Sequence, residues 1–261
     1  MIAYDVNVSY LMPDLPVEER LRRVADAGFK HFEWLFPQRI DVDELVRQKD
    51  KYGLSMVLLD TEIDPANPRG HLSNPDAGEV FWNRLNEAIA IARKTGARRI
   101  NVLCGLRLPE VERERQKEVI MSRLLHAAGL AEAEGIVLLI EALNHYDNPG
   151  YFLTSSKEGF DIVEAVNSPQ VKFQYDIYHM QLMEGNLINT IRANLDKIGH
   201  IQLADAPGRL APGTGEINFP NVLNAIQDAG YHGFVGLEYR PFPDGADPFA
   251  WLPAEVRGRT L

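Results

Sequence analysis

The stretch AEGIVLLIE, residues 133–141, passes from a helical pattern through one glycine into a short apolar run. The same pattern of helix, glycine and apolar run recurs at ADAGFKHFEWL (25–35), KYGLSMVLL (51–59), KTGARRINVL (94–103), KIGHIQLA (197–204) and DAGYHGFVGLE (228–238). Each run is rich in Val, Ile, Leu or Phe, which is typical of strands covered on both faces. We expect each glycine to end a helix in the left-handed conformation. These glycines are Gly28, Gly53, Gly96, Gly135, Gly199 and Gly230.

Strand and helix patterns alternate along the whole chain. Strands are predicted near residues 2–8, 31–35, 54–59, 98–103, 136–141, 171–176, 199–204 and 233–238. Helices are predicted near 16–27, 41–52, 76–95, 109–134, 155–166, 181–197 and 218–229. Eight such units in 261 residues, with no break in composition, predict one (β/α)8 TIM barrel, a single domain over residues 1–261. An open doubly wound sheet is the alternative, although no glycine-rich phosphate loop follows an early strand.

Composition narrows the class of protein. A formal net charge of -10 argues against a nucleic-acid partner, because an acidic surface repels phosphate backbones. The single cysteine, Cys104, rules out a disulfide within the chain and favours a reducing, cytoplasmic location; we expect it to be a packing residue. The first residues, MIAYDVNVSYL, do not resemble a signal peptide, and no apolar stretch is long enough to span a bilayer, so no membrane partner is expected.

Oxygen-bearing side chains mark the ends of the last four predicted strands. The active site of such a barrel lies at the C-terminal ends of the strands, and three carboxylates gathered there would repel one another without a counter-charge. An all-oxygen ligand set favours one Mg²⁺ or Mn²⁺ ion over Zn²⁺. A lone acid at a strand end more often caps a helix or pairs with a surface arginine, but four in succession argue against that. The predicted ligands are Glu141, Asp176, Gln202 and Glu238.

Two histidines follow these strands. His179 comes three residues after Asp176 in FQYDIYHMQLMEG (173–185), and we expect it to line the site. The alternative is a buried imidazole bonded to backbone. His145, in the segment after the fifth strand, is either a site residue or an ordinary loop residue.

Longer strings resemble the hydroxypyruvate isomerase family, within the xylose-isomerase-like TIM barrels. The strings are QYDIYHMQLMEG (174–185), GHIQLADAPGR (199–209), PGTGEINFPNVL (212–223), GLEYRP (236–241), and IEALN (140–144) followed by NPGYFLTSS (148–156). The resemblance covers nearly the whole chain and is strongest from about residue 136 to 241.

The resemblance implies one divalent metal bound by the same four residues, with Glu141 and Glu238 as the acid–base pair. The implied reaction interconverts hydroxypyruvate and tartronate semialdehyde (2-hydroxy-3-oxopropanoate). One carboxylate would remove the carbon-bound proton, an enediolate would form, and the second group would return a proton to the adjacent carbon. A metal-assisted hydride shift stays open.

An anionic substrate beside this site would need a cationic partner. Arg209, in the loop after the seventh strand, and Arg240, two residues after Glu238, are the candidates. The related ketose epimerases also place an arginine in that loop and a histidine after the Asp strand. In DTEIDPANPRGHLSNPD (60–76), only Arg69 and Gly70 match the family's acidic–Arg–Gly run, and a lysine is often found at the position of Arg240. Both places line the expected substrate mouth, so Arg69 is a further predicted substrate-binding residue.

The metal site is therefore a firmer prediction than the substrate. The expected partner is a small anionic hydroxy-oxo acid or sugar, and a homo-oligomer is compatible with the sequence. Rival functions are a 2-oxo-tetronate isomerase, a ketose 3-epimerase, a non-catalytic sugar-binding relative, and a DNA-repair endonuclease on the same barrel. The endonuclease would need a histidine-rich, multi-zinc rim and a basic face. Few of the seven histidines lie at predicted strand ends, and the net charge of the chain is acidic.

Overall fold

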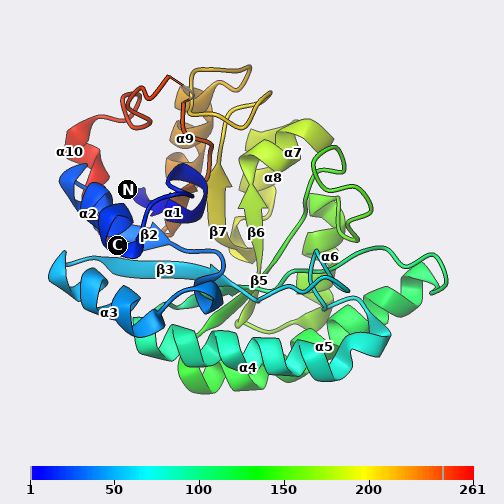
Figure 1. Ribbon diagram of the computed structural model, residues 1–261. Helices are drawn as coiled ribbons and strands as arrows, with labels where there is room; N and C mark the ends of the chain where they lie inside the picture. Colours follow the sequence, from blue (N-terminus) through cyan, green and yellow to red (C-terminus); the bar gives the residue numbers. More distant parts are fainter. Residues whose placement is uncertain (1, 243) are drawn as a thin grey trace.

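Eight parallel strands close into a barrel in chain order, and β8 pairs back with β1 (Figure 1). The computed structural model describes residues 2–242 and 244–261. The predicted (β/α)8 barrel is therefore confirmed, and all eight strands lie where the apolar runs predicted them. They are β1 (Ala3–Asn7), β2 (His31–Glu33), β3 (Ser55–Asp60), β4 (Arg99–Asn101), β5 (Val137–Glu141), β6 (Val171–Asp176), β7 (Ile198–Leu203) and β8 (Phe234–Leu237).

Helices surround the barrel, and the long pair α4 and α5 runs along one side of it (Figure 1). The described residues form α1 (Val8–Leu11), α2 (Val17–Asp26), α3 (Val42–Lys51), α4 (Gly78–Thr95), α5 (Arg113–Glu134), α6 (Ser156–Val166), α7 (Ile177–Met183), α8 (Leu187–Ala193), α9 (Phe219–Asp228) and α10 (Ala254–Arg257). The two shortest, α1 and α10, have only four residues each and carry too little periodicity to be predicted.

Two local predictions were wrong. The single helix expected over 181–197 is broken into α7 and α8, because Gly185 (φ 67°) and Asn186 (φ 50°) adopt left-handed conformations between them. Gly199 does not end a helix but lies inside β7. The other five glycines of the repeat have positive φ, as expected: Gly28, Gly53, Gly96, Gly135 and Gly230.

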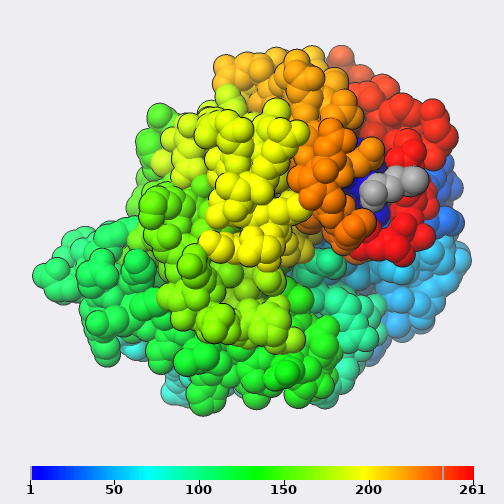
Figure 2. All heavy atoms as spheres, turned by 180° about the vertical axis from the view of Figure 1, so that it is seen from behind, coloured from blue at the N-terminus to red at the C-terminus, as the bar shows by residue number. Residues whose placement is uncertain are grey.

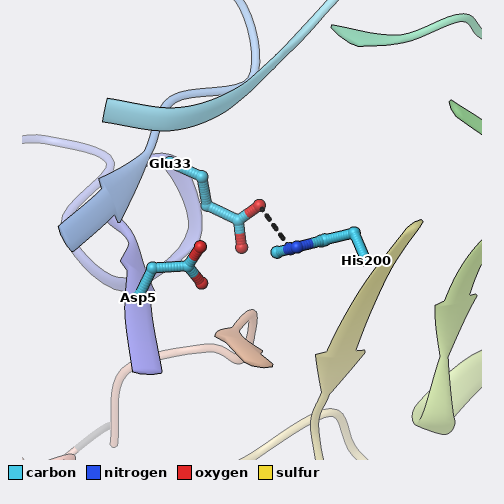
Figure 3. A group of neighbouring side chains, drawn as sticks. All are labelled: Asp5, Glu33 and His200. Atoms are coloured by element: carbon cyan, nitrogen blue, oxygen red, sulfur yellow. Dashed lines mark ion pairs between the residues drawn. The ribbon is translucent and has the colours of Figure 1, made fainter. Parts of the chain in front are cut away.

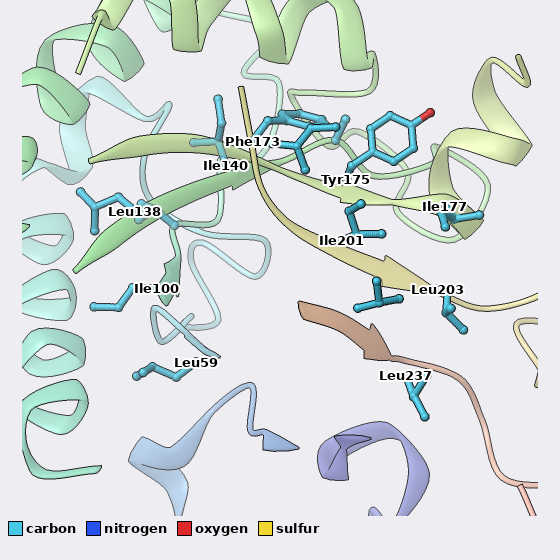
Figure 4. Packing of buried hydrophobic residues seen from close by; sticks show 14 of the residues in the cluster. Leu59, Ile100, Leu138, Ile140, Phe173, Tyr175, Ile177, Ile201, Leu203 and Leu237 are labelled. Carbon is cyan, nitrogen blue, oxygen red and sulfur yellow. The ribbon is translucent and has the colours of Figure 1, made fainter. Parts of the chain in front are cut away.

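Strand alternation separates an apolar outside from a polar inside. Outward side chains such as Ile100, Leu138 and Phe173 pack in a layer beneath the helices (Figure 4). Cys104 is fully buried, as expected for a packing residue. A second, much smaller hydrophobic cluster is separate from this layer. It consists of Val57, Leu58 and Leu139, packed with Val137 and Phe234. The remaining interior positions can therefore carry polar side chains.

The C-terminal segment closes the circle of helices. Figure 2 shows the last residues (red) beside N-terminal ones (blue), and the Arg257 guanidinium donates to the carbonyl oxygens of Ala27 (3.3 Å) and Phe249 (2.8 Å). No helix in the described part of the chain is long and apolar enough to cross a membrane.

Gly199 and Gly129 provide a matched test of packing inside and outside the barrel. A Cβ on Gly199 would lie 2.7 Å from Leu139 Cδ2 and from Lys172 Cβ, so Gly199→Ala should destabilise the protein by about 1–3 kcal/mol. Gly129 lies exposed within α5 with nothing within 4 Å of such a Cβ, so Gly129→Ala should stabilise by about 0.5–1 kcal/mol. Urea unfolding of the two variants measures both effects, and shifts of the same sign would contradict this packing account.

Candidate active site

The four predicted oxygen ligands meet at the C-terminal ends of β5 to β8. Glu141 and Asp176 are the last residues of β5 and β6, Gln202 lies in β7, and Glu238 directly follows β8. In the strand register Asp176 is opposite Gln202, and Glu141 is opposite Gln174. All four side chains are buried, with Glu141 and Glu238 each 5% exposed at the open end of the barrel.

Neighbouring amides orient the Glu141 carboxylate. Its Oε2 accepts hydrogen bonds from Asn101 Nδ2 (2.9 Å) and Gln174 Nε2 (3.0 Å). The same Gln174 nitrogen donates to Gln202 Oε1 (2.7 Å), while Gln202 Nε2 donates to Glu33 Oε2 (2.9 Å). This chain fixes which end of the Gln202 amide points toward the strand-end carboxylates.

Arg209 supplies the positive charge nearest to these acids. Its Nη2 donates to Glu238 Oε1 (2.6 Å) and to Asp176 Oδ2 (3.4 Å), and its guanidinium lies over the rings of Tyr10 and Tyr178. Burial would lower the pKa of Arg209, but the carboxylates of Glu238 and Asp176 outweigh that effect and raise it. The residue expected to contact substrate is therefore also the internal counter-ion of the site.

The loop that carries Arg209 is organised around one buried carboxylate, Asp205. Its two oxygens accept hydrogen bonds from the backbone N–H groups of residues 206, 213, 214, 215 and 217, at 2.9–3.1 Å. Gly215 must be a glycine here, since a Cβ would lie 2.1 Å from the carbonyl oxygen of Ala206. The strings ADAPGR and PGTGEI are thus two halves of one turn that holds Arg209, at φ 56°, facing inward.

His179 faces the site with a neutral imidazole ring. Burial, reinforced by the Arg209 charge, holds its pKa well below the usual value. Its Nδ1 accepts a hydrogen bond from the backbone N–H of Asn144 (3.1 Å), so the single proton of the neutral ring must be on Nε2. That nitrogen is 3.5 Å from Asp176 Oδ2. His179 therefore faces the site with a proton rather than a free lone pair.

The strand-end acids retain protons more strongly than ordinary carboxylic acids. Burial first, and then the charges of Glu238 and Asp176, raise the pKa of Glu141 well above its usual value. Burial also raises the pKa of Glu238 well above its usual value, although the positive charge of Arg209 opposes this shift. One guanidinium cannot balance all of this negative charge, so the donor set of three carboxylates and one amide oxygen fits an additional divalent cation.

A small cavity of about 150 Å³ opens onto this group. Among the residues predicted to belong to the site, those that line it are Glu141, His179, Arg209, Glu238 and Arg69.

The other predicted site residues do not line this cavity. Asp176 and Gln202 are buried behind its wall, at 1% and 0% exposed. Arg240 borders a neighbouring groove. His145 is exposed, with its ring 4.1 Å from that of Tyr146.

Sequence reasoning missed the polar ends of the first four strands. Asn7, Glu33, Asp60 and Asn101 are the last residues of β1 to β4, and all are buried. Asp60 and Asn101 also line the cavity. The strand-end rule that selected Glu141 and Asp176 would have found these residues had it been applied to the first half of the chain.

Removing the Arg209 guanidinium should destabilise the metal-free protein. Arg209→Met leaves Asp176 and Glu238 buried without their partner, a change expected to reduce the free energy of unfolding by about 3–5 kcal/mol. Arg240→Met is the matched control, because that side chain is exposed; its effect should stay within about 0.5 kcal/mol. Urea unfolding in the presence of a chelator measures both, and equal losses would contradict the pairing.

The chain is similar to several known proteins over nearly its whole length. The family model described as "Xylose isomerase-like TIM barrel" matches residues 21–255. Hydroxypyruvate isomerase of Escherichia coli (strain K12) is 37% identical over 254 residues, covering 97% of this chain and 98% of the relative. A 2-oxo-tetronate isomerase of Cupriavidus necator is 32% identical, covering 97% and 98%.

A solved structure named AP endonuclease, family 2, from Brucella melitensis is 31% identical, with a TM-score of 0.92, covering 96% of this chain and 98% of that one. The chain therefore belongs to the hydroxypyruvate isomerase family of xylose isomerase-like TIM barrels, and it is an isomerase.

Proposed function

We propose that the chain interconverts hydroxypyruvate and tartronate semialdehyde with the help of one divalent metal ion. The observation that carries the proposal is the placement of two glutamates, Glu141 on β5 and Glu238 after β8, in the wall of the same small cavity. The 37% identity to a hydroxypyruvate isomerase supports this choice of substrate.

Glu141, Asp176, Gln202 and Glu238 would hold the metal, and Mg²⁺ or Mn²⁺ suits their oxygen atoms. The bound ion would stabilise negative charge on the substrate oxygens. His179 complements this set without joining it, because its Nε2 proton points at Asp176. Arg209, bonded to Glu238 and Asp176, limits the excess negative charge.

The two glutamates would exchange protons with adjacent carbons of the substrate. One, as carboxylate, removes the carbon-bound proton to form the enediolate; the other, protonated, returns a proton to the neighbouring carbon. Burial raises the pKa of both glutamates in the metal-free protein, and a bound cation would lower both. Asn101 and Gln174 hold the Glu141 carboxylate in position for the transfer.

The cavity favours a short, anionic substrate. Its volume of about 150 Å³ lies below the roughly 300–1,000 Å³ of pockets that enclose drug-sized ligands. Arg69 lines it, and among the described residues its side chain makes only one hydrogen bond, to the adjacent Pro68 carbonyl (3.4 Å). The backbone of Arg69 is anchored, because its carbonyl oxygen accepts from Gly105 N (2.9 Å). This leaves the guanidinium available for a substrate carboxylate.

Two alternatives share the acid–base machinery. A 2-oxo-tetronate isomerase is supported by the 32% identical relative of that name, and its four-carbon acid would use the same arginine. A ketose 3-epimerase would use the same metal and glutamates, but its uncharged substrate would leave Arg69 without a partner. The DNA-repair reading suggested by the name of the Brucella melitensis structure is less well supported, because the net charge of -10 opposes binding to DNA.

Proton NMR in deuterated water tests the reaction. With Mg²⁺ present, hydroxypyruvate should give tartronate semialdehyde carrying solvent deuterium, and a chelator should stop turnover. Glu141→Gln and Glu238→Gln should each slow it by about 10²–10⁴-fold. The control Glu164→Gln, on the exposed face of α6, should leave the rate unchanged.

Product that contains no deuterium would indicate a hydride shift instead of proton transfer. Full activity in either glutamine variant would overturn the acid–base pair. Turnover of a four-carbon 2-oxo acid but not of hydroxypyruvate would overturn the named substrate while keeping the chemistry.

Steady-state kinetics can show which of Arg69 and Arg240 binds the substrate carboxylate. Arg69→Met should raise KM for the anionic substrate by about 10-fold or more with a smaller change in kcat, because a charged hydrogen bond to the ground state is lost. Arg240→Met should change KM little, since that side chain borders a different groove. The reverse ranking would move the carboxylate site to Arg240.

A further inference from the structure

A second group of titratable side chains lies inside the barrel, away from the cavity. Asp5 is in the middle of β1, Glu33 ends β2, and His200 lies in β7. One ligand atom from each lies within 4.8 Å of the others, and all three residues are 0% exposed. Figure 3 shows the carboxylates of Asp5 and Glu33 facing each other, with the His200 ring directed at Glu33.

These side chains have few partners among the described residues. Both oxygens of Asp5, Oε1 of Glu33 and both ring nitrogens of His200 are buried with no hydrogen bond. His200 Nε2 lies 3.5 Å from Glu33 Oε2, too far for a hydrogen bond of ordinary length. Buried polar atoms are ordinarily paired, because leaving them unpaired is unfavourable by several kcal/mol. Three residues that each have unpaired atoms, and that each bring one ligand atom to within 4.8 Å of the others, indicate that another group binds there.

The charges in this region favour a cation. Both carboxyl groups are fully buried, and burial followed by the charge of Glu33 raises the pKa of Asp5 to about 8. Arg99 is the nearest positive charge, but its Nε donates to the carbonyl oxygen of Gly199 (3.0 Å) rather than to either acid. The ring of His200 is fully buried with no hydrogen bond at either nitrogen, so a neutral ring has an unused lone pair to offer.

A glycine keeps this region open. Gly236 on β8 lies opposite Gln202, and a Cβ added to it would be 2.2 Å from Glu33 Oε1 and 2.9 Å from Asp5 Oδ1. Any side chain at position 236 would therefore occupy the space that the two carboxylates face. Two independent observations, the unpaired atoms and the open space, thus indicate the same place.

We propose that Asp5, Glu33 and His200 bind a second divalent cation, separate from the strand-end site. Two carboxylate oxygens and one imidazole nitrogen form a mixed set that suits a first-row transition ion such as Zn²⁺ or Mn²⁺. The ion would keep Glu33 ionised. Its Oε2 would then continue to accept from Gln202 Nε2 and so hold the Gln202 carbonyl oxygen toward the other site.

The test counts metal ions. Protein stripped with a chelator is reloaded with Mn²⁺, which suits both ligand sets, then freed of excess by gel filtration and assayed for manganese per chain by elemental mass spectrometry. Wild type should hold two ions. Asp5→Asn, which keeps the volume of the side chain, and Gly236→Ala, which fills the space, should each hold one, as should the strand-end control Asp176→Asn. Circular dichroism confirms that each variant is folded.

The outcomes separate this site from the proposed function. A wild-type count of one that survives Asp176→Asn and is lost in Asp5→Asn supports the second site while contradicting the strand-end one. A count of one that Asp176→Asn removes, a count of zero, or two ions retained in Asp5→Asn and Gly236→Ala overturns the inference.

Discussion

The structure depends on one constraint: carboxylates buried at the end of a closed barrel must be compensated by positive charge. Isolated, these groups would be strongly disfavoured in an interior of low dielectric. Arg209 compensates part of the charge through Glu238 and Asp176, and amides of Asn101, Gln174 and Gln202 orient the oxygens. The remaining excess of negative charge is what a metal and an acid–base reaction can use.

The barrel tolerates this concentration of buried charge because its main stabilising core lies elsewhere. Outward-facing side chains of the strands form the main apolar core with the helices, so the interior does not have to supply that core. The Asp205 turn, bonded to five backbone N–H groups, then sets Arg209 over the carboxylates from a loop. The strands position the carboxylates, and one well-ordered loop supplies the positively charged Arg209 side chain.

Much of this arrangement could be predicted because it is local and periodic. Apolar runs, six of them at a glycine, predicted all eight strands, and strand alternation placed Glu141 and Asp176 at one rim. The inward pairing of Arg209 could not be predicted from the sequence, because its partners Asp176 and Glu238 lie 33 and 29 residues away along the chain. Asp5 was overlooked because it lies within a short apolar run, and a single strand does not reveal that β2 and β7 bring Glu33 and His200 beside it. The exposure of His145 depends on the path of its loop, which has no periodicity to predict it.

The most direct test of the account is a crystal structure of the protein soaked with Mn²⁺, with anomalous diffraction measured to locate the ion. An anomalous peak is expected within bonding distance of the side-chain oxygens of Glu141, Asp176, Gln202 and Glu238, with His179 outside the ligand set. A fully soaked crystal with no peak at these four residues would contradict the claim that the buried negative charge at the strand ends is a metal site.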